Sequence, residues 1–230
     1  MKLTTEITGG LLALTIGMMA CGGKGSPAAN TAAKPANTNT AANAAAPKKE
    51  ENAKAALTDS KRPDGKAKTA SKKVPVPESW VYVYDSAKGY GFSVPSGSTG
   101  GSETHEGVNT FIALTPPPAE VGVVVITFKD KEMSKEDLLD VAEKFMGELG
   151  ATVTAGELKG ASENYYVCEA TVVSKDGKKS KNKILVGTDV SDNYVMIVGA
   201  EESKYAANLA IIDGIWGSFE MWSGGASGAN

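Results

Sequence analysis

Histidine is nearly absent from this chain of 230 residues, and its shortage excludes several kinds of site. His105 carries the only imidazole, so no second one exists for a zinc site or a proton relay. Glu103 and Glu106 flank it, and the three side chains could together chelate a metal. They follow a Gly/Ser-rich stretch at residues 97–102, which predicts a solvated loop without a rigid scaffold. We therefore expect neither a metal site nor a cofactor.

Catalytic signatures are also missing. No serine of the aromatic-containing part of the chain lies in a Gly-x-Ser-x-Gly nucleophile elbow. No P-loop is present, and no Gly-x-Gly-x-x-Gly segment follows a strand and opens a helix. Aspartate and glutamate are abundant, but without converging partners they are expected to be surface charge. The sequence therefore predicts that the protein is not an enzyme.

Aromatic residues are absent from the first 79 positions, because all Phe, Trp and Tyr residues lie between Trp80 and Trp222. A segment without rings and with few large aliphatic side chains cannot bury enough apolar surface to offset chain entropy. Roughly 145 residues remain, enough for one domain that buries about 68–70% of its unfolded surface. We expect this domain to span residues 76–222 and to fold without the preceding segment, with residues 223–230 as a flexible tail.

Long hydrophobic runs are missing too. The uncharged N-terminal stretch from Ile7 to Ala20 is too short to span a bilayer as a helix, which needs about 20 residues. It follows the positive charge of Lys2 and ends at small residues. This pattern predicts a cleaved signal peptide over residues 1–20.

The end of this stretch carries a more specific motif. Met18-Met19-Ala20-Cys21, followed by Gly22-Gly23, resembles the lipobox of bacterial lipoproteins. The resemblance implies that the chain is cut before Cys21 and that the thiol is diacylated, with palmitate-like chains holding the mature protein on a membrane. By the same analogy, a glycine after the cysteine implies the outer rather than the inner membrane. The alternative is an ordinary signal peptide with a chance cysteine.

The second cysteine, Cys168, has no thiol partner once the first is acylated. It lies in the run Tyr165–Val172, which has strand character. Alternation places Cys168 on one face with Tyr166, Ala170 and Val172. Because that face is apolar, we expect an inert core thiol rather than a reactive one.

Residues 21–75 are rich in Ala, Asn, Thr, Pro and Lys, a composition typical of a disordered tether. Residues 22–75 hold eleven Lys and Arg against four Asp and Glu, a balance of +7. From Val76 onward twelve Lys oppose twenty-two acidic residues, a balance of −10. Either both regions are merely soluble, or the basic tether lies on anionic lipid headgroups or envelope polymers while the acidic domain is repelled outward.

Periodicity within the domain predicts eight strands and two helices. The expected strands are 80–84, 90–94, 110–115, 122–129, 152–158, 165–173, 181–188 and 194–199. Ser134 is expected to cap a helix that Gly150 ends. The expected buried stripe of that helix is Leu138, Ala142, Phe145 and Leu149. A second helix is expected over 204–219, with one face formed by Tyr205, Leu209, Ile212, Trp216 and Phe219. This order predicts an α+β domain, a mostly antiparallel sheet flanked by two helices.

Three segments of the domain also support a family resemblance. They are Gly89-Tyr90-Gly91-Phe92-Ser93-Val94-Pro95, the helix start Ser134-Lys135-Glu136-Asp137-Leu138, and Ile215-Trp216-Gly217-Ser218-Phe219. In this order they resemble the PsbP-like and DcrB-like families, over nearly the whole domain. The family often carries a Trp shortly after the strand-ending proline, where this chain has residues 97–102. The resemblance implies an auxiliary or assembly protein that binds partners, with no shared catalytic residues.

Lysines gather in one short segment, because five of the domain's twelve lie between Lys175 and Lys183. Asp176-Gly177 predicts a hairpin turn, and alternation then places Lys179, Lys181 and Lys183 on one strand face. These lysines either protect an exposed sheet edge from aggregation or dock an anionic partner. Nucleic acid is not expected as that partner, because the domain is acidic and the chain is exported.

The first hairpin is rich in aromatic residues that either pack the sheet or line a ligand groove: Trp80, Tyr82, Tyr84, Tyr90 and Phe92. Taken together, the sequence favours a membrane-anchored, non-enzymatic binding or assembly module of the cell envelope. The alternative is a small-molecule or metal carrier that uses a groove between sheet and helix.

Overall fold

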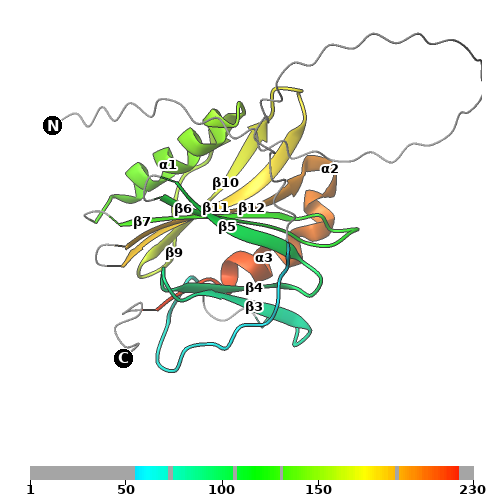
Figure 1. Cartoon of the computed structure of the whole chain (residues 1–230). Coiled ribbons are helices and arrows are strands. Elements are labelled where there is room, and N and C mark those ends of the chain that lie inside the picture. The colour runs from blue at the N-terminus through cyan, green and yellow to red at the C-terminus, as the bar shows by residue number, and fades with distance from the viewer. Residues whose placement is uncertain (1–54, 72–74, 106–107, 130–131, 190–191, 223–230) are drawn as a thin grey trace, which may run out of the picture. The chain divides into compact units, whose positions relative to one another are not determined.

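The computed structural model describes residues 55–71, 75–105, 108–129, 132–189 and 192–222. Within them, two antiparallel sheets lie face to face, and helix α1 (Lys135–Glu148) packs on the outer face of the larger sheet (Figure 1). Helices α2 (Glu202–Tyr205) and α3 (Leu209–Gly217), joined by the 3₁₀ turn Ala206–Asn208, pack on the other face beside the smaller sheet. The prediction of a mostly antiparallel α+β domain is confirmed.

The larger sheet contains nine of the described strands in the order β1-β5-β6-β7-β12-β11-β10-β8, and β9 also pairs with β10. Their bounds are β1 Ala55–Ala56, β5 Thr99–His105, β6 Val108–Leu114, β7 Gly122–Lys129, β8 Thr152–Ala155, β9 Lys159–Ser162, β10 Tyr165–Val173, β11 Lys179–Asp189 and β12 Asp192–Glu201. The long hairpins β10–β11 and β11–β12 make the centre of this sheet, and their register places each alternate residue on the same face.

The smaller sheet contains four described strands in the order β2-β13-β4-β3. Their bounds are β2 Lys68–Thr69, β3 Trp80–Asp85, β4 Tyr90–Pro95 and β13 Glu220–Met221. The hairpin β3–β4 matches the predicted strands at 80–84 and 90–94, and Gly89 makes its turn with φ at 67°. The last strand of the domain, β13, therefore lies between β4 and a strand from the region predicted to be a tether.

The core between the sheets is built largely from aromatic rings. Tyr90 and Phe92 of β4 stack against Phe219, whose ring centroid lies 5.8 Å from that of Tyr90. Tyr165 and Tyr194 of the larger sheet meet the Phe219 ring edge-on at 6.0 Å. Such offset and edge-on contacts favour packing beyond the apolar area that they bury. Phe219 is thus the central side chain of the layer between the sheets.

Helix α1 begins as predicted, because the Ser134 hydroxyl accepts a hydrogen bond of 3.1 Å from the Asp137 amide. Its buried stripe is Leu138, Ala142 and Met146, spaced by four residues. The predicted stripe with Phe145 and Leu149 is wrong at its C-terminal half. Leu149 follows the end of the helix and is 43% exposed, while Phe145 packs only at the margin of the core.

The predicted single helix over 204–219 is also wrong. The 3₁₀ turn divides it, and there the Asn208 side-chain amide donates to the carbonyls of Ala119 and Lys204. Of the predicted face, Tyr205, Ile212 and Phe219 are buried and Trp216 packs at the margin of the core, so only Leu209 is exposed.

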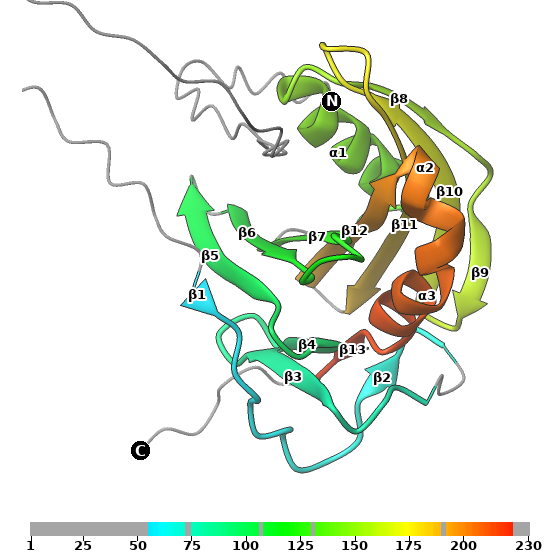
Figure 2. The ribbon, with the colours of Figure 1, turned by 90° about the vertical axis from the view of Figure 1, so that its right-hand side faces the viewer.

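Residues 55–71, here called the N-terminal strap, belong to the domain although the sequence placed them in a disordered tether. Strand β1 pairs with the edge strand β5, and β2 pairs with the last strand, β13. Between them the strap passes the edge strand β3, where the Asp59 carboxylate accepts from the Tyr82 amide and the Ser60 amide donates to the Tyr82 carbonyl. Figure 2 shows the strap running past the smaller sheet from β1 to β2. The domain therefore begins at least as early as Ala55, and the predicted boundary at residue 76 is wrong.

The predicted Gly/Ser-rich loop at 97–102 is wrong for most of its length, because strand β5 begins at Thr99. Gly97 makes the turn before it with φ at 83°. Neighbours on both sides, β1 and β6, pair with β5 and supply its main-chain hydrogen bonds. A Cβ atom at Gly100 would lie 2.6 Å from the Ile112 carbonyl oxygen, so the absence of a side chain allows this close pairing. Tertiary pairing has overridden a composition that disfavours strands.

Candidate functional sites

The predicted lysine face lies in the middle of the larger sheet, not at an edge. Strand β11 pairs with β10 on one side and with β12 on the other, so edge protection by Lys179, Lys181 and Lys183 is wrong. Lys179 is exposed, as a docking residue would be. The other two lysines face acidic residues of the C-terminal helices.

Lys183 is the most constrained of the three. Its ammonium lies 2.5 Å from a carboxylate oxygen of Asp213 in α3, and only 15% of its side chain is exposed. The same ammonium lies 5.4 Å from the ring centroid of Trp216, whose indole donates to Asp213 at 3.0 Å. Lys181 makes a longer ion pair of 3.8 Å with Glu202 of α2. Lys183 therefore fastens α3 to the sheet. Lys181 keeps about half of its side chain exposed and makes only a long contact with α2.

Cys168 lies where the sequence predicted, in the core beneath α1. It is 4% exposed and shares that core with Ala170, while Tyr166 and Val172 pack at its margin. Burial, with a smaller contribution from the negative charge of Glu143, raises the pKa of its thiol to about 11. The thiol is therefore protonated at neutral pH, as expected for an inert core residue.

Glu103 and His105 both lie in strand β5, so the two positions are part of a paired sheet rather than a loop. Glu106 lies outside the described residues. Among the residues that the structure describes, no group of three or more His, Cys, Asp or Glu side chains is placed to hold a metal ion. The same residues include no helix long and apolar enough to cross a membrane. Cys21 and the predicted signal peptide also fall outside the described part of the chain.

The aromatic hairpin divides between the core and the outside. Tyr90 and Phe92 are fully buried between the sheets. Trp80 lies over Gly214 of α3, where a Cβ atom would stand only 2.8 Å from the indole. Tyr82 and Tyr84 occupy the opposite face of the smaller sheet, with their rings stacked at 6.5 Å. Most of the hairpin's rings therefore pack the fold, in line with the core interpretation.

A polar cluster on that outer face joins the strap to the last strand; we call Arg62, Tyr82, Glu220 and Trp222 the outer-face cluster. Arg62 donates to one Glu220 oxygen at 2.6 Å, and the Tyr82 hydroxyl donates to the other at 3.0 Å. The Trp222 indole donates to the Tyr82 oxygen at 3.0 Å, and the Arg62 guanidinium lies 4.4 Å from the Tyr82 ring centroid. Each of the four side chains has a partner within the cluster, so the cluster holds the strap in place.

Glycine at position 91 makes the outer-face cluster possible. Strand β4 lies between β3 and β13, so the Tyr82 ring must cross it to reach Glu220. A Cβ atom at Gly91 would lie 2.1 Å from the Tyr82 hydroxyl oxygen, which is impossible without displacing the ring. Burial and the neighbouring Glu220 charge raise the pKa of Tyr82 well above its usual range, so its hydroxyl stays a donor at neutral pH.

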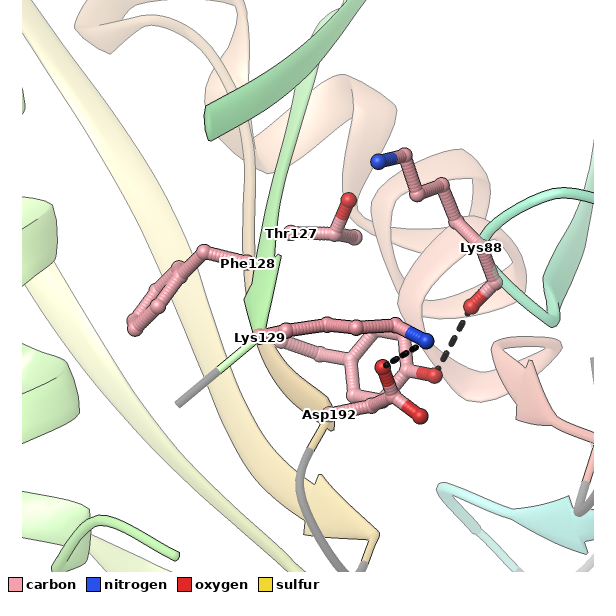
Figure 3. Close-up of a pocket in the computed structure, with 6 residues that line it drawn as sticks. Lys88, Thr127, Phe128, Lys129 and Asp192 are labelled. Atoms are coloured by element: carbon pink, nitrogen blue, oxygen red, sulfur yellow. Dashed lines mark hydrogen bonds and ion pairs between the residues drawn. The ribbon is translucent and has the colours of Figure 1, made fainter. Parts of the chain in front are cut away.

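A pocket that the sequence did not predict opens between the two sheets at one end of the domain. It has a volume of about 280 Å³ and is lined by Lys88, Thr127, Phe128, Lys129, Asp192 and Tyr194. Figure 3 shows the Thr127 hydroxyl and the Lys88 ammonium pointing toward one another, while Phe128 points away. No sequence signal connects Lys88 of a hairpin turn with Thr127 of a strand, because only the stacking of the two sheets brings them together. The predicted carrier groove between sheet and helix therefore differs in position from this pocket.

Neither a protein-family model nor a curated protein matches this sequence. Solved structures do match the domain. The solution structure of cyanobacterial PsbP (CyanoP) from Synechocystis sp. PCC 6803 superposes with a TM-score of 0.51 at 18% identity, over 66% of this chain and 98% of that chain. A protein of Bacteroides thetaiotaomicron VPI-5482 gives a TM-score of 0.40 at 10% identity, over 63% of this chain and 49% of that chain. The first likeness shows that the domain has a PsbP-like fold.

Proposed function

We propose that this protein is a lipid-anchored lipoprotein of the bacterial cell envelope, and that its domain is a non-enzymatic binding or assembly module. The observation that carries the proposal is the PsbP-like fold, which agrees with the family resemblance of the three sequence segments. That resemblance implies partner binding without shared catalytic residues. The lipobox-like sequence ending at Cys21 supports the anchor, and the glycine after it favours the outer membrane.

The strap adds a structural reason for an anchored arrangement. Residues 22–54 separate Cys21 from the first described strand, and from there the chain is hydrogen-bonded into both sheets. An acyl anchor at Cys21 would thus connect to the domain through paired main chain at the edge of β5.

Replacing the acylated residue tests the anchor directly. Cells that make the wild-type chain or Cys21→Ser would be labelled with palmitate, and their membranes would be separated on a density gradient. We expect label and outer-membrane fractionation for the wild type only, with the variant unprocessed or soluble. A variant that still incorporates label and sediments with membranes would contradict the proposal.

The binding role needs its own experiment. The acylated protein would be cross-linked in intact cells and recovered under denaturing conditions, with Cys21→Ser as the matched control. We expect a defined envelope partner that depends on the anchor. The proposal would be wrong if the protein were recovered without any partner and the purified protein catalysed a reaction. An enzymatic function would then take the place of the binding role.

The second candidate function is a small-molecule carrier, and the pocket between the sheets favours it. A metal cargo finds no support in this pocket, because its lining holds two lysines and a single carboxylate.

A further inference from the structure

The pocket between the sheets has a lysine held in a fixed position at its mouth. Lys88 lies in the β3–β4 turn, where an Asp85 carboxylate oxygen accepts from the amides of Ala87 and Lys88. The Lys88 carbonyl accepts from the Tyr194 hydroxyl of the larger sheet at 2.9 Å. Burial raises the pKa of Tyr194 well above its usual range, so this donor persists at neutral pH. The turn is thereby tied to both sheets, and the stem of Lys88 starts from a rigid backbone.

The positive charge of Lys88 forms no ion pair with the other residues that the structure describes. Among the described residues, no carboxylate lies within ion-pair distance of its ammonium, whereas Lys68, Lys183 and Lys204 all have such partners. Both oxygens of the nearby Asp85 accept from the turn amides and from the Asn109 side chain. A cation with no partner beside a cavity is suited to an anionic ligand.

Thr127 gives the second, independent sign of a ligand. It is 3% exposed, and its hydroxyl oxygen has no hydrogen-bond partner among the protein atoms. A buried hydroxyl without a partner costs about 1–3 kcal/mol, so native structures usually satisfy such groups with water or a ligand. Its hydroxyl points toward Lys88 at the same side of the pocket (Figure 3).

The same strand as Thr127 supplies a second cation, and the paired strand β12 supplies an apolar surface. Lys129 makes only a long ion pair of 3.8 Å with Asp192, and its side chain is 73% exposed. The Tyr194 ring forms part of the wall. At about 280 Å³ the cavity lies just below the usual size for drug-like ligands, so it suits a molecule of a few carbon atoms.

We propose that this pocket binds a small carboxylate ligand, with the Lys88 ammonium and the Thr127 hydroxyl donating to the carboxylate and Lys129 as the second cation. The proposal rests on the carrier function rather than on the lipid anchor. Its failure would leave the fractionation of the Cys21→Ser variant unchanged, so the two proposals can fail separately.

The test uses full-length protein in detergent, with succinate as the probe and the uncharged succinamide as its matched control. Ionic strength is held constant with sodium chloride. Succinate at about 10 mM should raise the thermal midpoint by about 2 °C or more, because a ligand that binds only the folded state stabilises it. Succinamide should give no shift.

Three variants locate the effect. Lys88→Gln and Thr127→Val should each weaken succinate binding at least about tenfold by calorimetry, the size expected for loss of one charge-assisted or buried hydrogen bond. Both should fold, because the Lys88 charge has no described ion-pair partner and the Thr127 hydroxyl has no hydrogen-bond partner. Lys178→Gln is the control, since Lys178 pairs only with Asp176 in the β10–β11 turn.

Thr127→Val separates the proposal from a structural role. Without ligand its midpoint should equal or exceed that of the wild type, while its response to succinate is lost. Three results would overturn the proposal: no shift of the wild type, equal shifts with succinamide, or equal succinate shifts in all variants. The last result would identify a general salt effect at the surface.

Discussion

The pair between Arg62 and Glu220 offers the sharpest test of the strap, and Arg62→Met is the change that isolates it. Methionine keeps a long apolar stem near the Tyr82 ring but removes the guanidinium. Glu220 then keeps only the Tyr82 hydroxyl as a donor, and its side chain is 9% exposed. A carboxylate that loses its cation in such a position is poorly hydrated.

The magnitude follows from how far the pair is buried. Fully buried pairs cost about 3–5 kcal/mol when one partner is removed, whereas exposed pairs contribute about 0–1 kcal/mol. Half of the Arg62 side chain is exposed, so solvent screens the pair and an intermediate value applies. We expect a loss of about 2 kcal/mol in the free energy of unfolding. For a domain of this size, each kcal/mol lowers the midpoint by about 2–4 °C, which predicts a fall of about 4–8 °C.

The strap contains its own control, the neighbouring Lys61. Its side chain is 87% exposed and pairs at 3.8 Å with an equally exposed Asp64. Lys61→Met should therefore change stability by less than about 0.5 kcal/mol, although it removes the same charge from the adjacent position.

A double-mutant cycle completes the assay. Chemical denaturation would be measured for Arg62→Met, Glu220→Gln and the double variant. Glutamine removes the uncompensated charge, so the double variant should regain part of the lost stability, with a coupling energy of about 1–2 kcal/mol. A coupling below about 0.3 kcal/mol would refute the pairing of the strap with β13.

Three further predictions follow from the same structure. A chain that begins at residue 76 should melt at least about 5 °C below the mature protein in calorimetry, because it lacks the strap; equal midpoints would restore the boundary that the sequence predicted. Lys183→Gln should cost about 1 kcal/mol in urea titrations, while Lys179→Gln stays within about 0.5 kcal/mol, since only the first lysine is paired and largely buried. Cys168 should react with iodoacetamide at pH 8 at least about a hundredfold slower than a free cysteine, because a pKa near 11 rather than 9.0 leaves far less thiolate; rapid labelling of the native protein would place the thiol outside the core.

Local pattern predicted the elements that have strong periodicity. Alternating apolar residues identified β4, β7, β10 and β12, and the Ser134 cap identified α1. The apolar face around Cys168 was also predicted, because a strand's two faces follow from the sequence alone. These features need no knowledge of which segments become neighbours.

The sequence did not predict that the strap belongs to the domain, because the strap is not held there by apolar residues that composition would reveal. Strands of two residues have no period, and the one fully buried side chain of the strap is Ala70, which is small. What holds the strap is main-chain pairing and two cations, Arg62 and Lys68, whose partners lie more than 100 residues away. Composition indicates whether a segment can form a hydrophobic core by itself. It does not indicate whether the segment can pair with sheets that the rest of the chain forms.

Strand order explains the other errors. Alternation placed Lys179, Lys181 and Lys183 on one face, and the contacts of Lys181 and Lys183 with the C-terminal helices agree, yet nothing local showed that β11 is central. The pocket residues Lys88 and Thr127 likewise become neighbours only through the stacking of the two sheets.

The pairing of strap and last strand also constrains the order in which this protein can fold. Arg62 and Glu220 are 158 residues apart, and a polypeptide leaves the ribosome with its N-terminus first. The strap therefore remains unpaired until the strands and helices that separate it from β13 in the sequence have been synthesised. Contacts this distant in sequence form slowly, because the entropy of closing a long loop is lost before the contacts contribute any favourable free energy. The segment of the domain that is synthesised first is thus among the last to reach its place.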